Sequence, residues 1–274
     1  MKRIMIAGTN SGCGKTTVTC AVLQALVNRK FNVSSFKCGP DYIDPMFHKT
    51  VIGTAAYNLD TYLMSNDTVN YLLNKNSGDI AVIEGVMGFY DGFSFTEKGS
   101  THELSEITDT DVILVVNCRG MSLSAMALVK GFKEFRKNNI KGVIFNNLSE
   151  KLYGNLSEEC LKIGLVPLGF LPNIKDVQIS SRHLGLVTAG EIDGIKDKMN
   201  LLADYAEKYI DIDKILEISE NNRDTKFTSL EITKKYNVKI AVAYDRAFCF
   251  YYEENKRVLR QQGLELVEFS PMED

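Results

Sequence analysis

The sequence predicts a parallel α/β fold, and three observations support this prediction. Short apolar segments rich in β-branched residues alternate with longer segments of helical periodicity. Most of the apolar segments are continuous runs, as expected for strands that are covered on both faces. The first of them leads directly into a glycine-rich turn, and a helical segment follows. We therefore expect an open parallel sheet with helices on both faces.

The predicted elements of this sheet follow one another along the first two thirds of the chain. Strands are expected at residues 3–7, 32–37, 80–84, 112–116, 143–146 and 165–171. Helices are expected at residues 15–28, 67–75, 102–108, 123–137 and 158–163, the last with Ser157 as its N-cap. Beyond them, residues 172–188 are predicted as an extended loop, and residues 189–209 as a long amphipathic helix that residues 210–219 extend or follow.

A polar segment at residues 220–228 predicts a linker, after which the α/β pattern restarts. Strands are expected at 238–244 and 264–269, with a helix at 252–262 between them. The predicted organisation is a first domain at 1–220, a linker at 221–237 and the start of a second α/β domain at 238–274. Two strands and a helix do not bury a core of their own, so we expect this second domain to be cut short.

Composition and charge exclude several classes of protein. The 274 residues are 45% hydrophobic and 24% charged, which is typical of globular domains and excludes disordered and collagen-like chains. A net charge of -3 argues against whole-surface attraction to nucleic acid or anionic lipid. Neither a cleavable leader nor a membrane-spanning stretch is evident, and the six cysteines show no Cys-x-x-Cys pair. We expect a cytoplasmic protein with reduced thiols and with neither nucleic acid nor membrane as a partner.

The glycine-rich turn predicts a phosphate-binding loop. It follows the first strand, opens the first helix and has the sequence Gly8-Thr9-Asn10-Ser11-Gly12-Cys13-Gly14-Lys15-Thr16. The spacing departs from G-x-x-x-x-G-K-[ST] by one place, because Thr9 stands where the first glycine is expected. Glycines still allow backbone N–H groups to face a phosphate at the helix N-terminus. The alternative is a glycine-rich turn that binds nothing.

The loop assigns roles to individual residues and makes the predicted fold P-loop NTPase-like. Lys15 is predicted to reach the β- and γ-phosphates of ATP, and the Thr16 hydroxyl to ligate Mg²⁺. The expected nucleotide-binding residues are Asn10, Ser11, Gly12, Cys13, Gly14, Lys15, Thr16 and Thr17.

Two further groups of charged residues follow predicted strands. Glu84 ends the third predicted strand, where a carboxylate can hold Mg²⁺, and Asp91 lies in the glycine-rich segment 85–92 after it. Lys37 ends the second predicted strand, and Asp41 and Asp44 follow in a loop that contains two prolines and a glycine. The alternatives are a capping or solvated acid for Glu84 and a structural turn for the aspartates. Because ligands bind at the carboxyl edge of such sheets, we predict that Asp41 and Asp44 take part in catalysis and that the loop with Asp91 can approach the same site.

Five motifs extend the interpretation to a family. They read GTNSGCGKT, FKCGPDYIDP, IEGVMGFYDG, SSRHLGLVTAGE and IAVAYDRAFCFYY. In this order the chain resembles the cobyrinic acid a,c-diamide synthase family over essentially its whole length. Cobyric acid synthases lack the Gly-Pro-Asp-Tyr-Ile-Asp stretch. Dethiobiotin synthetases share the G-x5-G-K-T loop, and ParA- and MinD-like ATPases carry a second loop lysine where this chain has Asn10.

The resemblance implies a reaction and its participants. ATP phosphorylates the c- and then the a-carboxylate of a corrinoid polycarboxylate, and ammonia released from glutamine by a second domain replaces each phosphate. Lys15 and Thr16 match the family's nucleotide and Mg²⁺ residues, and Glu84 its second Mg²⁺ carboxylate. Asp41, Tyr42, Asp44 and Asp91 match loops that orient substrate and support phosphoryl transfer, and Lys37 is placed to neutralise phosphate or a substrate carboxylate.

Other matches leave alternatives open. Asn146, at the end of the fifth predicted strand, is expected either to contact adenine or to cap a loop. Arg182 and His183 are expected to contact ligand or to anchor their loop. Residues 240–274 resemble the opening of a glutaminase domain, in which Cys249 comes too early to be the nucleophile. We therefore expect this chain to use ammonia but not glutamine, and we leave its oligomeric state open.

Three alternative functions remain at this level. The same chemistry could act on hydrogenobyrinic acid or on nickel sirohydrochlorin. A dethiobiotin synthetase-type carboxylation is disfavoured by the GPDYIDP loop, and a ParA-like regulatory ATPase is disfavoured by Asn10.

Overall fold

The first of two compact units, Met1–Phe227, is built around a seven-stranded sheet. The computed structural model describes residues 1–174, 189–220, 225–228 and 235–273. The sheet has the order β3-β2-β4-β1-β5-β6-β7, and all its neighbouring strands are parallel. The strands are β1 (Lys2–Gly8), β2 (Val33–Cys38), β3 (Ala55–Leu59), β4 (Ile80–Glu84), β5 (Val112–Asn117), β6 (Ile140–Asn146) and β7 (Val166–Leu171). The predicted parallel α/β fold is confirmed.

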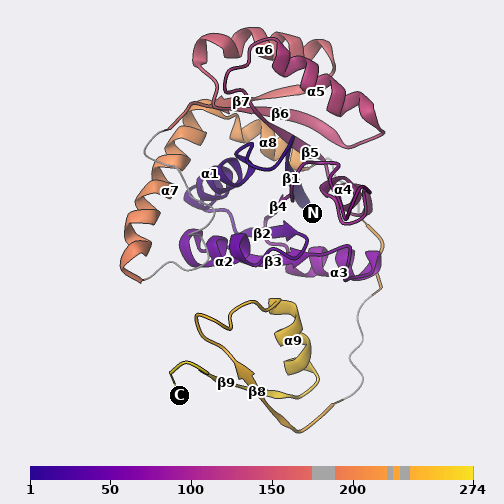
Figure 1. Cartoon of the computed structure of the whole chain (residues 1–274), viewed down its shortest axis with the longest axis vertical. Coiled ribbons are helices and arrows are strands. Elements are labelled where there is room, and N and C mark those ends of the chain that lie inside the picture. Colours follow the sequence, from indigo (N-terminus) through magenta and orange to yellow (C-terminus); the bar gives the residue numbers. More distant parts are fainter. Residues whose placement is uncertain (175–188, 221–224, 229–234, 274) are drawn as a thin grey trace. The chain divides into compact units, whose positions relative to one another are not determined.

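Helices cover both faces of this sheet (Figure 1). One face packs against α1 (Lys15–Asn28), α7 (Ala189–Tyr209) and α8 (Ile212–Ser219). The other face packs against α3 (Asn66–Asn76), α4 (Thr101–Ile107), α5 (Ser124–Phe135) and α6 (Glu150–Lys162). Alternate residues of β1 point to opposite faces of the sheet. Ile4 and Ile6 pack in the layer with α1, and Met5 and Ala7 pack in the layer with α4. Burial on both sides explains why the strands are continuous apolar runs.

The sequence interpretation missed three elements near the site. These are β3, the short helix α2 (Ile43–Phe47) and the π-helical turn η1 (His48–Ile52). Strand β3 is only five residues long and includes Asn58, whose amide donates to two backbone carbonyls. Its strand conformation therefore depends on its parallel pairing with β2 more than on local propensity. Because of β3, the third and fifth predicted strands are β4 and β6.

The predicted start of the helix at residue 158 is wrong. Helix α6 begins at Glu150, with Ser149 at the N-cap position, so Ser157 lies inside the helix and does not cap it. Leu152, Leu156 and Cys160 pack at a spacing of four residues into the second layer. This spacing is the helical signal, which the many polar residues between them obscured.

The second unit, Thr228–Asp274, is much smaller. It contains β8 (Lys239–Ala243) and β9 (Glu265–Phe269), which pair in parallel, and α9 (Glu253–Gln261). Every residue of both strands is partly or fully exposed, in contrast to the strands of the first unit. Most of the predicted linker lies outside the described residues.

Two chain-wide observations complete the fold. All six cysteines are free thiols, and every one except Cys249 is buried. Within the described residues, no helix has the length and apolar character required to cross a membrane.

Candidate active site

The carboxyl edge of the sheet brings together residues from three neighbouring strands. In the parallel register, Glu84 of β4 lies between Ile6 of β1 and Lys37 of β2. The chain leaves β1 at Gly8 to form the glycine-rich turn, and it leaves β2 at Cys38 to form the loop with Asp41. The motifs predicted from separate parts of the sequence therefore meet at one edge, where open α/β sheets bind ligands.

The glycine-rich turn is shaped by positions that accept no side chain. Gly14 has φ +94°, and a Cβ there would lie 1.8 Å from Nδ2 of Asn146. Gly12 also has a positive φ of 78°, which glycine adopts without strain. Asn10, Ser11 and Gly12 are exposed to solvent. The turn thus presents backbone to an incoming ligand at the N-terminus of α1, the place where helices favour anions.

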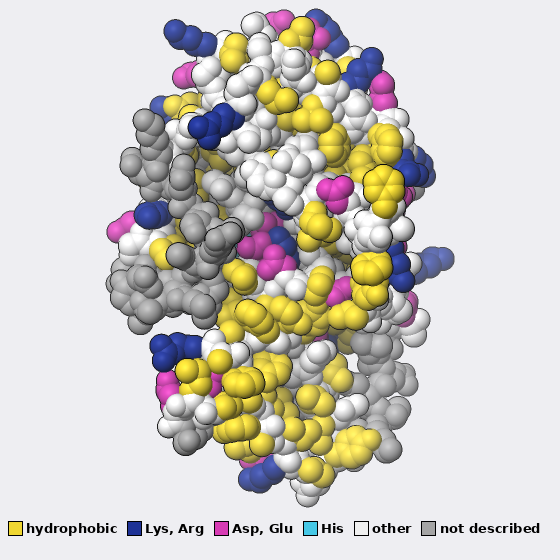
Figure 2. All heavy atoms as spheres, in the orientation of Figure 1, with side chains coloured by type: hydrophobic (Ala, Val, Ile, Leu, Met, Phe, Trp, Pro, Cys, Tyr) yellow, Lys and Arg dark blue, Asp and Glu magenta, His cyan; other side chains and the backbone are white. Residues whose placement is uncertain are grey.

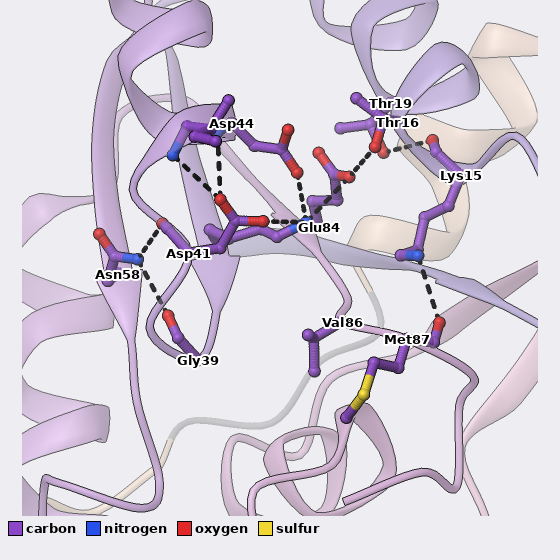
Figure 3. Close-up of polar contacts among 12 residues, drawn as sticks. Lys15, Thr16, Thr19, Gly39, Asp41, Asp44, Asn58, Glu84, Val86 and Met87 are labelled. Atoms are coloured by element: carbon purple, nitrogen blue, oxygen red, sulfur yellow. Dashed lines mark hydrogen bonds and ion pairs between the residues drawn. The ribbon is translucent and has the colours of Figure 1, made fainter. Parts of the chain in front are cut away.

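Lys15 is held over this turn by the loop that follows β4. The residue is only 8% exposed, and its Nζ donates to the backbone carbonyl of Met87 at 3.2 Å (Figure 3). Met87 adopts φ +45°, a conformation that is uncommon for a residue with a side chain. A carbonyl contact is weaker than a contact with phosphate oxygens, so Lys15 can exchange one partner for the other.

Asp91 stabilises the same loop through a hydrogen bond to its backbone. Its Oδ2 accepts a hydrogen bond from the backbone N–H of Gly88 at 3.0 Å, and the residue is exposed. A Cβ on Gly88 would lie 3.0 Å from the carbonyl oxygen of Thr9, so this loop lies against the glycine-rich turn. Asp91 is therefore beside the predicted phosphate loop rather than among the other aspartates.

A buried chain of charged groups links α1 to the loop after β2. Thr16 Oγ1 donates to Glu84 Oε1 at 2.6 Å, and Lys37 Nζ donates to the same oxygen at 3.1 Å (Figure 3). Lys37 Nζ also donates to Asp44 Oδ2 at 2.5 Å and lies 3.6 Å from Asp41 Oδ2. Glu84 and Lys37 are 0% and 3% exposed. Lys37 therefore shares one positive charge among three carboxylates.

This sharing moves the pKa values of the cluster. Burial opposes the charge of Lys37, but the attraction of Glu84, Asp44 and Asp41 outweighs it and raises the pKa of Lys37 above its usual value. Burial, together with the charge of Glu84, raises the pKa of Asp44 to about 7. Burial also acts against the charge of Glu84, yet Lys37 and His48 hold its pKa below the usual range. Glu84 is thus the permanent anion, and Asp44 is the carboxyl that can take up a proton near neutral pH.

The loop after β2 is fixed by hydrogen bonds to its backbone. Asp41 Oδ1 accepts from the N–H of Ile43 at 3.0 Å, and Asn58 Nδ2 donates to the carbonyls of Gly39 and Asp41 at 2.9 and 2.8 Å. Tyr42 precedes α2 and is half-buried beside them. Asn58 had no sequence signal, because it becomes a partner of this loop only through the pairing of β2 with β3.

His48 is a second residue that sequence reasoning missed. It is buried at the start of η1, with Nε2 3.4 Å from Glu84 Oε2. Among the described residues, neither ring nitrogen of His48 nor Oε2 of Glu84 has a hydrogen-bond partner. The three histidines show no metal-ligand spacing, so spacing alone could not single out His48.

The oxygen atoms at this edge suit Mg²⁺. Thr16 supplies a hydroxyl and Glu84 a carboxylate with one oxygen left without a hydrogen bond, and hard oxygen ligands are those that Mg²⁺ takes. Within the described residues, no group of three or more His, Cys, Asp or Glu side chains could hold a metal ion by itself. Mg²⁺ in nucleotide sites is usually bound by one or two protein ligands together with substrate phosphates and water.

Asn146 lies on the other side of the glycine-rich turn. It is buried at the end of β6, and its Nδ2 donates to the carbonyl of Cys13 at 3.0 Å. Of the two predicted roles, this contact corresponds to the structural one, in which the side chain supports a loop. Arg182 and His183 lie outside the described residues.

The sequence of this chain is similar to a family of nucleotide-binding domains and to several named proteins. Residues 4–187 match the family model of the CobQ/CobB/MinD/ParA nucleotide binding domain. The chain is 45% identical over 276 aligned residues to the cobyrinate a,c-diamide synthase of Thermoplasma volcanium, covering 98% of this chain and 60% of the relative. It is 40% identical to the cobyrinate a,c-diamide synthase of Methanocaldococcus jannaschii, covering 100% of this chain and 63% of the relative. The chain thus spans roughly three fifths of the length of these relatives.

Among solved structures, the MinD cell division protein of Aquifex aeolicus superposes with a TM-score of 0.47 at 16% identity, covering 80% of this chain and 96% of that chain.

Proposed function

The chain belongs to the CobQ/CobB/MinD/ParA nucleotide-binding family, and from this premise we propose that it is the ATP-dependent ligase part of a cobyrinate a,c-diamide synthase. The observation that carries the proposal is the buried chain of contacts from Thr16 through Glu84 and Lys37 to Asp44. It joins a phosphate-binding turn to a group of carboxylates at one edge of the sheet. Such an arrangement suits the transfer of a phosphoryl group to a carboxylate substrate.

In this function ATP binds with its phosphates on the glycine-rich turn. Lys15 leaves the Met87 carbonyl and neutralises the β- and γ-phosphates, while Thr16 and Glu84 hold Mg²⁺. The ion, when bound, draws negative charge from the phosphate oxygens. No protein nucleophile is required, because phosphoryl transfer depends mainly on position and on charge neutralisation.

The substrate is a carboxylate of a corrinoid macrocycle. One of its oxygens attacks the γ-phosphorus, ADP leaves, and the product is an acyl phosphate. Ammonia then attacks the carbonyl carbon, the C–O bond to phosphate breaks, and the amide forms with the loss of one proton. Asp44 is suited to accept that proton, because its pKa of about 7 lies near the operating pH.

The loop from Cys38 to Asp44 orients the substrate in this scheme. Asp41 is fixed through its own side chain and through Asn58, and Tyr42 is half-buried next to it. Lys37 keeps the excess negative charge of the cluster low enough for an anionic substrate to approach. Ammonia is the nucleophile in this proposal, and a glutaminase domain would release it from glutamine.

The test is ADP release by this chain with ATP, Mg²⁺ and ammonium chloride. Cobyrinic acid, hydrogenobyrinic acid and nickel sirohydrochlorin are added separately. We expect one macrocycle to stimulate ADP release and to gain amide groups detectable by mass spectrometry, while glutamine in place of ammonia gives no product. If ATP is hydrolysed at the same rate with all three macrocycles and without any, the proposal is wrong. Turnover of glutamine to glutamate by this chain would refute the assignment of the donor.

A further inference from the structure

Four large apolar side chains project into solvent next to the candidate active site. Tyr62, Leu63, Phe93 and Phe95, which we call the rim patch, are 50%, 67%, 63% and 103% exposed. The rings of Tyr62 and Phe93 lie 5.3 Å apart, although they belong to different loops. Side chains of this kind contribute to stability when they are buried, and in the rim patch most of that contribution is not gained. Clustered exposed apolar residues of this kind mark binding surfaces.

The rim patch is fixed by the two loops that carry it. Asp60 Oδ1 accepts from the backbone N–H groups of Tyr62 and Leu63 at 2.9 and 3.1 Å. In the second loop, the N–H of Gly92 donates to the carbonyl of Thr96 at 3.0 Å, and that of Phe93 to the carbonyl of Lys98 at 2.7 Å. The exposed side chains therefore project from backbones with defined hydrogen bonds. A rigid surface loses little entropy when a ligand binds.

Both loops lie at the same sheet edge as the buried charged cluster. In the order β3-β2-β4, the first loop follows β3, the second follows β4, and the Asp41 loop follows β2 between them. Contacts join them: Asn58 holds the Asp41 carbonyl, and Oε2 of Glu103 accepts from Thr61 Oγ1 and from the N–H of Gly99. Near the middle of the face in Figure 2, acidic and basic side chains lie together, with hydrophobic side chains beside them.

We propose that the rim patch is the subsite for the apolar ring face of the macrocycle, an inference that rests on the proposed function. A carboxylate that reacts beside Asp44 is attached to a broad, rigid ring, and this ring must extend out of the buried cluster. The rim patch lies on the loops that flank the Asp41 loop, so it offers the ring an apolar surface directly outside. Aromatic side chains pack well against a flat conjugated face.

Lys98 adds a charge that suits the side arms of such a ligand. Its Nζ lies 5.1 Å from the centre of the Tyr62 ring, and the residue is exposed. The macrocycle carries several carboxylates besides the one that reacts. Lys98 can pair with one of them at the edge of the ring, which contributes to orientation more than to affinity because the pair is exposed.

The size of the rim patch favours a small molecule over a protein partner. A stable protein interface takes about 20–30 residues from each partner, whereas the rim patch has only its four large apolar side chains.

The experiment compares the double variant Phe93→Ser/Phe95→Ser with the unmodified chain. Both side chains are exposed, so the variant is expected to fold, and an unchanged Tm checks this. The matched control is Leu161→Ser, which removes an equally exposed apolar side chain on α6. Direct binding of cobyrinic acid is followed by equilibrium dialysis, using the visible absorbance of the macrocycle, and KM values are measured with ammonia as donor.

We expect the double variant to bind cobyrinic acid roughly tenfold more weakly, with a matching rise in its KM and no change in the KM for ATP. Leu161→Ser should change neither the binding of cobyrinic acid nor the two KM values. Unchanged macrocycle binding in the double variant would overturn the subsite and leave the proposed function standing. If the unmodified chain neither binds nor amidates any macrocycle, the proposed function fails and the subsite fails with it. Loss of binding to a glutaminase partner, without loss of macrocycle binding, would assign the rim patch to that partner instead.

Discussion

The two halves of the candidate site differ in what lines them, since one is lined mainly by backbone and the other by buried side chains. The nucleotide half is a glycine-rich turn in which exposed backbone surrounds one lysine and one hydroxyl, on Lys15 and Thr16. The carboxylate half is a buried cluster of side chains, in which Lys37 contacts Asp44 and Glu84 directly. In the first half, Lys15 contacts a carbonyl and would find its anionic partner in the phosphates of a ligand. In the second half, Lys37 is already paired with carboxylates of the protein.

This difference predicts how each half responds to substitution. Removing Lys15 removes a group that the unliganded fold uses for one carbonyl contact. Removing Lys37 leaves the buried carboxylates of Glu84 and Asp44 without their common partner. Substitutions in the first half should therefore affect ligand binding, and those in the second should affect stability as well. Four substitutions test this contrast, from the largest expected effect to the smallest.

The largest effect is expected for Lys37→Met. This change leaves Glu84 and Asp44 buried without a cation, and breaking a buried ion pair in this way costs about 3–5 kcal/mol. Urea unfolding of the unliganded chain at pH 7.5 measures the loss. The double variant Lys37→Met/Asp44→Asn should recover part of it, because asparagine removes a carboxyl that would otherwise have to be protonated or buried as an anion. A Lys37→Met variant as stable as the unmodified chain would show that the cluster is solvated rather than buried.

The same difference explains which half could be predicted from the sequence. The glycine-rich turn is contiguous, so its position between a strand and a helix is enough to predict that Lys15 binds phosphate. The carboxylate half depends on strand order: Lys37 meets Glu84 because β2 lies beside β4. Family resemblance pointed to Asp41 and Asp44, but their pairing with Lys37 needed the fold.

Residues that act through the sheet left no sequence signal at all. Asn58 reaches the Asp41 loop from a strand that was not predicted, and His48 reaches Glu84 from a turn that was not predicted. Asn58 belongs to β3 and His48 to η1, and each of these elements is only five residues long. Short elements are formed mainly by tertiary contacts, which periodicity does not detect.

The second largest effect is expected for Lys15→Ala. The loss of a hydrogen-bonded charge should weaken ATP binding by about 1.5–3 kcal/mol or more, while the stability of the unliganded chain changes little. Isothermal titration calorimetry with ATP and Mg²⁺ measures the first quantity and thermal unfolding the second. Lys151→Ala, an exposed position on α6, is the matched control. Unchanged ATP affinity would overturn the assignment of the turn.

The third effect concerns pH and isolates Asp44. The pKa of Asp44 is raised to about 7 in the folded chain. Between its ordinary pKa and pH 7, the folded chain therefore keeps a proton on Asp44 that the unfolded chain has lost. Its contribution to stability therefore falls as the pH rises through that range. Asn cannot ionise, so Asp44→Asn should lose this decline.

We expect the stability of Asp44→Asn, relative to the unmodified chain, to increase by at least about 1.4 kcal/mol between pH 4.5 and pH 7.5. Urea unfolding without Mg²⁺ or nucleotide measures it, and Asp204→Asn, an exposed position on α7, should show no such change. Parallel pH profiles for Asp44→Asn and the unmodified chain would show that Asp44 ionises as an ordinary surface carboxyl does.

The smallest effect is expected at Asn146, which decides between two roles in the nucleotide half. Its Nδ2 donates to the Cys13 carbonyl and lies against Gly14, so it supports the turn from behind. If support is its role, Asn146→Ala loses one hydrogen bond, worth about 0.5–1.5 kcal/mol, and weakens ATP and GTP binding by the same factor. If the side chain contacts adenine instead, the variant loses affinity for ATP only. Competition titrations with both nucleotides separate the outcomes. Equal losses would extend this contrast, because a buried side chain in contact with the turn would then support the backbone and not contact the ligand.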